Sequence, residues 1–334
     1  MNVAIIGASG YTGLELIKIL INHPKFDITY IANSSGEETL EELHPCLKDV
    51  LNVKVQKADA KEVSKVADLA FLALPHKTSM AFAKELLELG VKVVDLSADY
   101  RLELETYEKH YCPHEDKEHI NEAVYGLPEY YKKELKEAKL VANPGCYPTA
   151  SLLALLPFVD FIEEKTPIFI DAKSGVSGAG KKLSETSHFV HLNENIHAYN
   201  PFKHRHMPEI QEKVKLVKSK EFQINFVPHL LPITRGMLVS VYATLKDEID
   251  VEKVLEESYK NSKFVRIRKT PVDIKSTAGT NFCDIFVARN GKALFVNSSI
   301  DNLLRGASSQ AVVNANLMCG FEEDEGIPKI AYVP

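Results

Sequence analysis

The sequence predicts an α/β protein in two parts, a parallel sheet covered by helices and then a largely antiparallel sheet. Three observations support this prediction. Short apolar runs alternate with helical patterns through residues 1–145, which is typical of a parallel sheet. Longer strand patterns rich in Val, Ile and aromatic residues fill most of residues 146–301, with a hairpin signal at Asn290-Gly291. A last helical pattern, Asp301 to Met318, can return to the first part, so we expect domains at 1–145 plus 302–334 and at 146–301.

The composition is that of a globular protein with ample core. Of the 334 residues, 45% are hydrophobic and 26% are charged. The formal net charge of −6 argues against nucleic-acid binding. No apolar run approaches the ~18 residues that a membrane helix needs, and we expect neither a signal peptide nor a membrane partner. The five cysteines are scattered without a CxxC pair, so we expect reduced thiols and a cytoplasmic location.

The chain opens with an apolar strand at residues 2–7, which runs into Gly7-Ala-Ser-Gly-Tyr-Thr-Gly13 and a helix pattern ending near Ile21. A strand, a glycine turn and a helix form the dinucleotide-binding arrangement, in which a pyrophosphate approaches the helix N-terminus. The spacing is GxxGxxG rather than GxGxxG, so the fingerprint is a variant. We predict a Rossmann-type nucleotide-binding domain, and a purely structural turn is the alternative.

The ends of the next strands carry polar residues. The second strand, at residues 26–32, leads into Asn33-Ser34-Ser35, without the acidic residue that accepts from the ribose of NAD. These side chains can donate to a 2′-phosphate, which favours NADP, although no Arg follows and Glu37-Glu38 come soon after. Later strands end at Pro75-His76 and before Arg101. Arg101 can hold a carboxylate or phosphate bidentately, or pair with Asp99.

The most informative stretch is Asn143-Pro-Gly-Cys-Tyr-Pro-Thr149. It places Cys146 on a turn before an apolar helix, which we expect to begin near Pro148 and to stop before Pro157. A cysteine at a helix N-terminus faces unpaired N–H groups and the positive end of the helix dipole, and both favour the nucleophilic thiolate. A buried structural cysteine is the alternative.

Two further stretches suggest partners for this thiol. Ser174-Gly-Val-Ser-Gly-Ala-Gly180 can offer N–H groups to an anion, or it is a plain linker. His204-Arg-His206 supplies candidates for proton transfer. The HxH spacing can also ligate zinc, but no third ligand lies at a recognisable spacing, so we predict no metal. A cysteine hydrolase has no use for a dinucleotide, whereas a thiol with a nicotinamide cofactor points to reduction of an acyl group through a thioester.

Five motifs in this order resemble those of the N-acetyl-gamma-glutamyl-phosphate reductase family, relatives of aspartate-semialdehyde dehydrogenase. They are residues 7–13, 143–149, 174–180, His204-Arg-His-Met-Pro-Glu209 and Asp301-Asn-Leu-Leu-Arg-Gly306. The resemblance implies an enzyme that uses NADP(H) to reduce an acyl phosphate in arginine biosynthesis, with release of phosphate. It also implies a Rossmann domain completed by the C-terminal helix, a glyceraldehyde-3-phosphate-dehydrogenase-like second domain, and a homodimer or homotetramer.

The resemblance also assigns roles. Cys146 is the nucleophile, His206 the first choice for general acid–base catalysis, and His204 the alternate. Substrate binding falls to Arg101, Ser177, Tyr199 and Glu209. Cofactor binding falls to Gly7, Ser9, Gly10, Tyr11, Thr12, Gly13, Ser34, Pro75 and Asn302. Lys181 stands where Arg is common in the family, and a point charge replaces a bidentate fork there.

The sequence is also compatible with other functions. A lysine-pathway homologue acts on a substrate one methylene longer, which is worth only ~1–3 kcal/mol of discrimination. Aspartate-semialdehyde dehydrogenase is a further alternative. A Rossmann protein that has kept the fold for regulation without catalysis is the alternative from another class, and Cys146 with the paired histidines argues against it.

Overall fold

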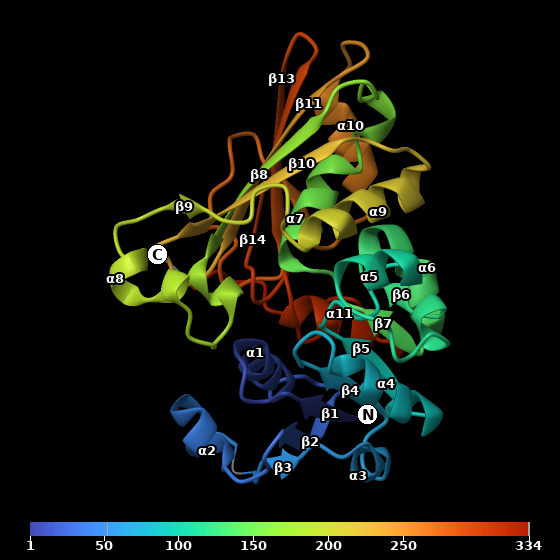
Figure 1. Ribbon diagram of the computed structural model, residues 1–334, viewed down its shortest axis with the longest axis vertical. Coiled ribbons are helices and arrows are strands. Elements are labelled where there is room, and N and C mark those ends of the chain that lie inside the picture. The colour runs from blue at the N-terminus through green and yellow to red at the C-terminus, as the bar shows by residue number, and fades with distance from the viewer. Residues whose placement is uncertain (52, 333–334) are drawn as a thin grey trace. The chain divides into compact units, whose positions relative to one another are not determined.

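The computed structural model describes residues 1–51 and 53–332, in two compact units that each contain a seven-stranded sheet (Figure 1). Unit 1 is Met1–Pro144 with Ala307–Pro328, and unit 2 is Gly145–Gly306 with Lys329–Pro334. Asn52, Val333 and Pro334, which fall within the expected domain ranges, lie outside the described residues.

Unit 1 contains a parallel sheet in the order β3-β2-β1-β4-β5-β7-β6, and every neighbouring pair in it is parallel. The strands are β1 (Asn2–Ile6), β2 (Asp27–Asn33), β3 (Gln56–Lys57), β4 (Leu69–Leu72), β5 (Lys92–Asp95), β6 (Val124–Tyr125) and β7 (Leu140–Ala142). The chain builds outward from β1 in both directions, first to β2 and then to β4. Ligands of such sheets bind at the carboxyl ends of the strands beside this switch point.

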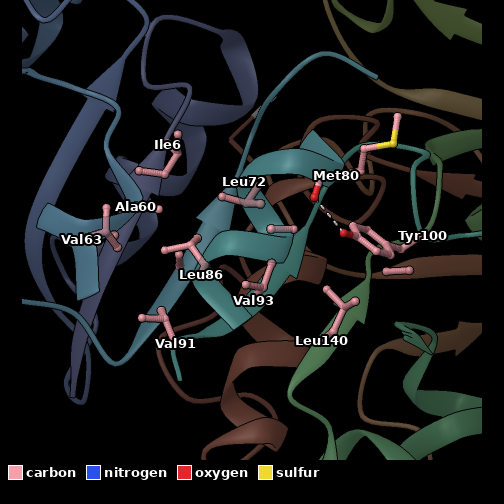
Figure 2. Packing of buried hydrophobic residues seen from close by; sticks show 14 of the residues in the cluster. Ile6, Ala60, Val63, Leu72, Met80, Leu86, Val91, Val93, Tyr100 and Leu140 are labelled. Atoms are coloured by element: carbon pink, nitrogen blue, oxygen red, sulfur yellow. Dashed lines mark hydrogen bonds between the residues drawn. The ribbon is translucent and has the colours of Figure 1, made fainter. Parts of the chain in front are cut away.

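Helices cover both faces of this sheet. They are α1 (Tyr11–Leu20), α2 (Leu40–Leu43), α3 (Ala60–Ser64), α4 (Ser79–Glu88), α5 (Leu104–His110), α6 (Pro128–Glu137) and α11 (Ser308–Met318). On one side, α1 and α6 contact α11; on the other, α3 and α4 contact each other. Figure 2 shows the second side, where Ile6, Leu72 and Val93 of the strands pack against helical residues such as Val63 and Leu86. Because both faces are covered, the strands read as continuous apolar runs.

Helix α11 begins later than the sequence predicts. Residues 302–307 form turns, because the Asp301 carboxylate accepts the N–H groups of Leu303 and Leu304, at 2.9 and 3.1 Å. The helix itself starts at Ser308, and Ala307 precedes it. The predicted start of this helix at Asp301 is therefore wrong.

Polar side chains fix α11 within unit 1. Asn314 donates to the carbonyl of Gly126 at 3.0 Å and to the side-chain oxygen of Asn143 at 3.0 Å. Gln310 also donates to Gly126 O, at 3.1 Å, and the Ser308 hydroxyl donates to Thr12 O at 2.9 Å. These bonds satisfy buried polar groups along a helix that is buried over its whole length.

Unit 2 contains a mixed sheet in the order β12-β13-β14-β11-β8-β10-β9. The strands are β8 (Ile168–Gly175), β9 (His197–Ala198), β10 (Ile224–Leu231), β11 (Met237–Thr244), β12 (Val265–Ile267), β13 (Cys283–Asn290) and β14 (Ala293–Ile300). The β8–β10 and β12–β13 pairs are parallel and the other four are antiparallel. The predicted fold class, a parallel sheet plus a largely antiparallel one, is confirmed. The expected hairpin joins β13 to β14 through Gly291 and Lys292, since Asn290 pairs with Ala293.

One face of the second sheet is covered by helices. Unit 2 contains α7 (Cys146–Leu155), α8 (Phe189–Leu192), α9 (His206–Lys218) and α10 (Val251–Tyr259). Helix α7 packs on β11, β14 and α9, and the Ser298 hydroxyl donates to Ala150 O at 2.9 Å. On the opposite face Phe169 and Tyr242 remain 47% and 46% exposed.

Helix α7 begins at Cys146, two residues before the expected start at Pro148. Gly145 is the N-cap, and its carbonyl accepts both the N–H and the hydroxyl of Thr149, each at 2.9 Å. Pro148 lies in the first turn, where a missing N–H costs nothing. Among the described residues, no helix combines the length and apolarity that crossing a bilayer requires.

Candidate active site

Cys146 is the first residue of α7 and lines a cavity of about 470 Å³ that is formed within unit 2. The lining residues are Cys146, Tyr147, Ser174, Gly178, Ala179, His197, Tyr199, Asn200, Lys203, His204, Arg205, His206 and Leu230. This set contains Lys203, Arg205 and three histidines, and none of the lining residues among those described is an Asp or Glu. A cavity lined by one sign of charge concentrates ligands of the other sign. The geometry therefore suits an anionic substrate next to the thiol.

Tyr147 organises the inner wall of this cavity. Its hydroxyl lies 3.0 Å from that of Tyr199, and its ring makes edge contacts with His204 and His206, with centroids 5.6 and 5.9 Å apart. Phe226 packs on the same ring at 5.3 Å. Burial raises the pKa of Tyr199 to about 12 and that of Tyr147 further still. Both phenols are therefore neutral hydrogen-bonding groups at physiological pH.

The two histidines of the HxH motif have different environments. The ring nitrogen Nδ1 of His204 accepts the backbone N–H of His206 at 3.1 Å, at the start of α9. Burial, with a smaller effect of the Arg205 charge, lowers the pKa of His204 to about 4. His204 is therefore a neutral imidazole that precedes α9 and accepts the N–H of its first residue. His206 lines the same cavity from the first position of that helix.

Glu209 forms a hydrogen bond with the turn that precedes Cys146. It is buried on the first turns of α9, and its carboxylate accepts the backbone N–H of Gly145 at 3.0 Å. It is not among the cavity-lining residues. The carboxylate thus fixes the residue that precedes Cys146.

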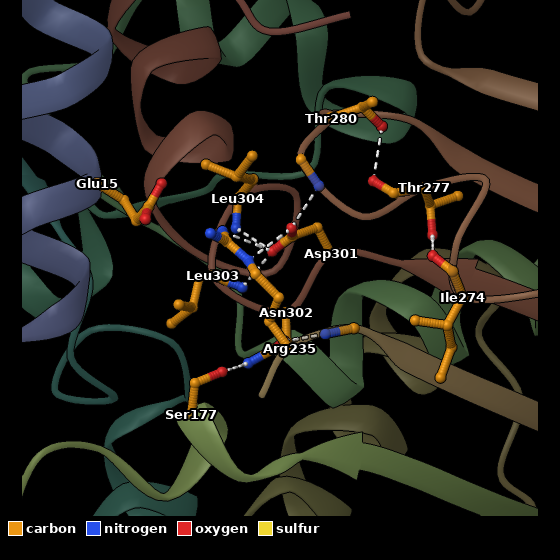
Figure 3. A network of polar contacts seen from close by, with 12 residues as sticks. Glu15, Ser177, Arg235, Ile274, Thr277, Thr280, Asp301, Asn302, Leu303 and Leu304 are labelled. Carbon is orange, nitrogen blue, oxygen red and sulfur yellow. Dashed lines mark hydrogen bonds and ion pairs between the residues drawn. The ribbon is translucent and has the colours of Figure 1, made fainter. Parts of the chain in front are cut away.

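A polar network joins four segments of unit 2 (Figure 3). Arg235 pairs with the buried Asp301 at 2.9 Å, and Asp301 also accepts the N–H of Gly279 at 2.7 Å. Asn302 accepts the N–H of Gly236 at 2.6 Å and donates to the Ser177 hydroxyl at 3.0 Å. The structure therefore brings together two residues to which the resemblance gives different ligands, Ser177 for substrate and Asn302 for cofactor.

The turn after Asn302 approaches the cysteine closely. A Cβ added at Gly306 would lie 2.6 Å from Cβ of Cys146 and 2.6 Å from the carbonyl oxygen of Asn302. Only glycine fits at this position without a shift of the turn.

The glycine turn of unit 1 has the shape that a dinucleotide pyrophosphate requires. Gly7 has a φ of +95°, and a Cβ there would collide with the carbonyl of Ala73, whose carbon lies 2.7 Å away. A Cβ on Gly13 would collide with the carbonyl oxygen of Gly7 and would lie 2.9 Å from the Ala8 Cα. Gly10 caps α1 in extended conformation and Tyr11 is its first residue. The chain therefore forms a tight turn at a helix N-terminus, with glycine where the backbone packs closest, and this fits a bound nucleotide.

The remaining predicted residues of unit 1 lie on loops after its strands. Ser34 is exposed after β2, and Pro75 accepts the N–H of Thr78 ahead of α4. Arg101 is buried, and its guanidinium donates to the carbonyls of Asn143 and Leu96, each at 2.7 Å. Arg101 thus holds the backbone at the end of β7, and its substrate contact stays a prediction.

The cavity also contains residues that the sequence interpretation missed. Tyr147, Ser174, His197, Asn200, Lys203, Arg205 and Leu230 line it. Lys203 and Arg205 flank His204, and this basic run was a readable signal. His197 enters because β9 pairs with β10, opposite Leu230, which nothing in the local sequence indicates. Among the described residues, no group of three His, Cys, Asp or Glu side chains lies close enough to hold a metal ion.

Comparison with known proteins identifies the family. Residues 2–138 match the model for the semialdehyde dehydrogenase NAD binding domain, and residues 146–302 match that for the semialdehyde dehydrogenase dimerisation domain. A protein of Sulfurovum sp. named N-acetyl-gamma-glutamyl-phosphate reductase is 64% identical over 334 residues, which is 100% of both chains. The chain belongs to the N-acetyl-gamma-glutamyl-phosphate reductase family.

Other members and more distant structures agree. The reductase of Sulfurimonas denitrificans is 58% identical over 100% of this chain and 99% of its own length. Aspartate semialdehyde dehydrogenase II of Vibrio cholerae, solved in complex with ASA, superposes with a TM-score of 0.72 over 96% of this chain and 98% of its own. The enzyme of Candida albicans, solved with NADP, reaches 0.69 over 95% and 98%. These structures are 17% and 13% identical, so they show the shared fold.

Proposed function

We propose that this reductase converts N-acetyl-gamma-glutamyl phosphate to N-acetylglutamate 5-semialdehyde and phosphate, with NADPH as reductant, in arginine biosynthesis. The observation that carries the proposal is Cys146 at the start of α7 in a cavity lined by basic side chains. Full-length relatives at 56–64% identity that bear the reductase name support it.

The cysteine is the nucleophile of this proposal. Its sulfur attacks the acyl carbon, the carbon–oxygen bond to phosphate breaks, and phosphate leaves with a thioester on Cys146. The helix N-terminus favours the thiolate. Because Gly145 is fixed by Glu209 and Gly306 leaves no space beside Cβ, the sulfur has a defined starting position for the attack.

His206 is the general acid–base group. His204, the other candidate, uses Nδ1 as an acceptor and has a pKa of about 4, so it does not compete with His206 for the thiol proton. A group of that pKa is a poor acid and base near pH 7. His206 takes the proton of Cys146 and returns one to the oxygen that develops when the thioester is reduced.

Unit 1 binds the cofactor. NADPH, when bound, supplies the hydride that reduces the thioester. Gly7, Gly10 and Gly13 leave room for its pyrophosphate at the start of α1. Predicted contacts of unit 1 also come from Ser9, Tyr11, Thr12, Ser34 and Pro75. Asn302, the remaining predicted cofactor contact, belongs to unit 2. On the substrate side, the predicted contacts are Tyr199, Ser177, Arg101 and Glu209, of which Tyr199 lines the cavity.

The chain assembles with itself, and we propose a homodimer formed through the open face of the second sheet. Tyr242, Phe295 and Phe286 form an aromatic cluster on that face, with ring centroids 5.3 and 6.4 Å apart. Phe169 and Tyr242 are large apolar side chains that remain about half exposed, which is typical of an interaction surface. A cytoplasmic location is proposed because the five cysteines are thiols that are not joined in disulfides.

The test is the reverse reaction. Purified protein is given NADP, phosphate and one of three aldehydes: N-acetylglutamate semialdehyde, N-acetylaminoadipate semialdehyde or aspartate semialdehyde. We expect phosphate-dependent formation of NADPH with the first substrate. A preference for the second would move the protein to the lysine pathway. Folded protein that binds NADP but turns over none of the three would contradict catalysis altogether.

A further inference from the structure

The loop after β2 is organised by one buried amide. Asn33, 5% exposed, accepts the N–H of Ser35 at 3.1 Å and the N–H of Gly36 at 2.7 Å through its side-chain oxygen. This Asx turn fixes the end of the strand next to β1, where the adenosine ribose of a dinucleotide lies in Rossmann domains. The amide nitrogen of Asn33 then points out of the turn.

A carboxylate receives that amide. One oxygen of Glu38 accepts Nδ2 of Asn33 and the hydroxyl of Ser35, both at 2.9 Å. Two of the three polar side chains that the sequence offers to a 2′-phosphate therefore already bond to a negative charge. The acidic residue that reads a ribose 2′-hydroxyl normally stands at the end of β2. In this chain, the Glu38 carboxylate lies at the end of β2, because it bonds to Asn33, five positions earlier in the sequence.

The neighbouring strand supplies the opposite charge. Asn33 and Lys57 are register partners on β2 and β3, and register partners of adjacent strands share a face of the sheet. Gly36 packs directly on this strand end, since a Cβ there would lie 2.8 Å from the Lys57 Cα. Lys57 is exposed, so its ammonium group can serve as a phosphate contact on the rim of this loop.

We propose that Glu38 and Lys57 set the choice between the two nicotinamide cofactors, and that their opposition leaves the protein able to bind NADH as well as NADPH. The Glu38 carboxylate accepts the 2′-hydroxyl of NADH and repels the 2′-phosphate of NADPH. Lys57 attracts that phosphate. This inference rests on the cofactor site of the proposed function and extends it to a cofactor that the proposal does not include.

Binding, rather than turnover, tests this proposal. The chain contains no Trp, so the fluorescence of the reduced nicotinamide can be followed without interference from indole. We expect the wild-type dissociation constants for NADPH and NADH to lie within about tenfold of each other. Glu38→Gln should bind NADPH about tenfold more tightly and NADH more weakly, and Lys57→Gln should bind NADPH about tenfold more weakly with NADH little changed.

Glu37→Gln is the matched control. Glu37 is the exposed neighbour of Glu38, and its substitution removes the same charge. The proposal fails if Glu38→Gln and Glu37→Gln give the same pair of constants, or if the wild type prefers NADPH more than a hundredfold. The wild-type ratio decides the second point even if a variant does not fold. Normal binding of both cofactors without any phosphate-dependent reaction would support this inference and contradict the proposed function.

Discussion

Two helix N-termini, the start of α1 in unit 1 and the start of α7 in unit 2, show how differently one sequence can build similar sites. The first is largely local: Gly13 requires glycine because of the backbone of Gly7 and Ala8, whereas Gly7 also meets the backbone of Ala73, which follows β4. The second is held by distant residues. Glu209 lies 64 positions after Gly145, and Gly306 meets Cys146 from the far end of unit 2.

This contrast separates binding from chemistry. A phosphate needs backbone N–H groups and space, which a local motif can supply by itself. A nucleophile needs a defined position, a proton acceptor and an anion site, which a local motif cannot supply. Substitutions at each of the two helix N-termini can test this division.

Replacing Cys146 by Ser should separate the two sites completely. Serine retains the shape of the turn but has no accessible anion near pH 7, so phosphate-dependent turnover should fall by about a thousandfold or more. NADPH binding should stay within error of the wild type when it is measured by nicotinamide fluorescence. A parallel loss of binding and turnover would mean that Cys146 has a structural role.

Alanine substitution should lower the unfolding free energy at one glycine of the β1–α1 turn and leave it nearly unchanged at another. Gly13→Ala forces a Cβ against Gly7 and to 2.9 Å from the Ala8 Cα, so we expect a loss of about 1–3 kcal/mol in unfolding free energy and of NADPH binding. Gly10→Ala is the control for the unfolding free energy, because its nearest contact within the protein would be an ordinary 3.7 Å. Thermal unfolding of both variants checks the stability difference, and cofactor titration of Gly13→Ala checks its loss of binding. Equal tolerance of the two would contradict the packing argument.

The sequence was sufficient for the first of these sites and only in part for the second. The β1–α1 turn, the two kinds of sheet and the position of Cys146 follow from local patterns of apolar residues and glycine. The start of α11 did not follow, because the Asp301 side chain captures the N–H groups of Leu303 and Leu304. The support of Gly145 by Glu209 and the entry of His197 through β9 also required the folded chain, since strand pairing and helix contact join residues far apart in sequence.

Removing the support of the cysteine turn should affect turnover moderately. Glu209→Ala leaves the buried N–H of Gly145 without its acceptor, which costs about 1–3 kcal/mol. We expect kcat to fall about tenfold or more with little change in KM, and NADPH binding to be retained. Glu209→Gln keeps an acceptor oxygen and should recover much of the rate.

Glu212→Ala is the control on the same helix, because Glu212 is buried and pairs with Lys213 at 2.9 Å. Its loss should lower stability without the specific fall in kcat. If both variants lose turnover in proportion to stability, Glu209 only holds α9 in place and does not position the cysteine.

The smallest expected effect is the acid response of the wild type, because the two units contribute to it with opposite signs. Burial lowers the pKa of His204 in unit 2 to about 4 and, aided by the charge of Asp99, raises that of Asp95 in unit 1 to about 6. As the pH falls from about 6.5 to 4, unfolded chains protonate at His204 while folded ones do not, so the free energy of unfolding decreases. As the pH falls from about 6 to 3.8, folded chains protonate at Asp95 while unfolded ones do not, so the free energy of unfolding increases.

Each contribution amounts to about 3 kcal/mol, and the two nearly cancel in the sum. Denaturant unfolding of the two units, followed at pH 6.5 and pH 4.5, should therefore show unit 2 weakening while unit 1 strengthens. His204→Gln should abolish the weakening of unit 2, and Asp95→Asn should abolish the strengthening of unit 1. A common response of both units to acid, unchanged in either variant, would contradict the assignment of these two groups. If the two units respond in this way, the loss of stability at low pH is confined to unit 2, which contains the nucleophile and whose site depends on long-range contacts.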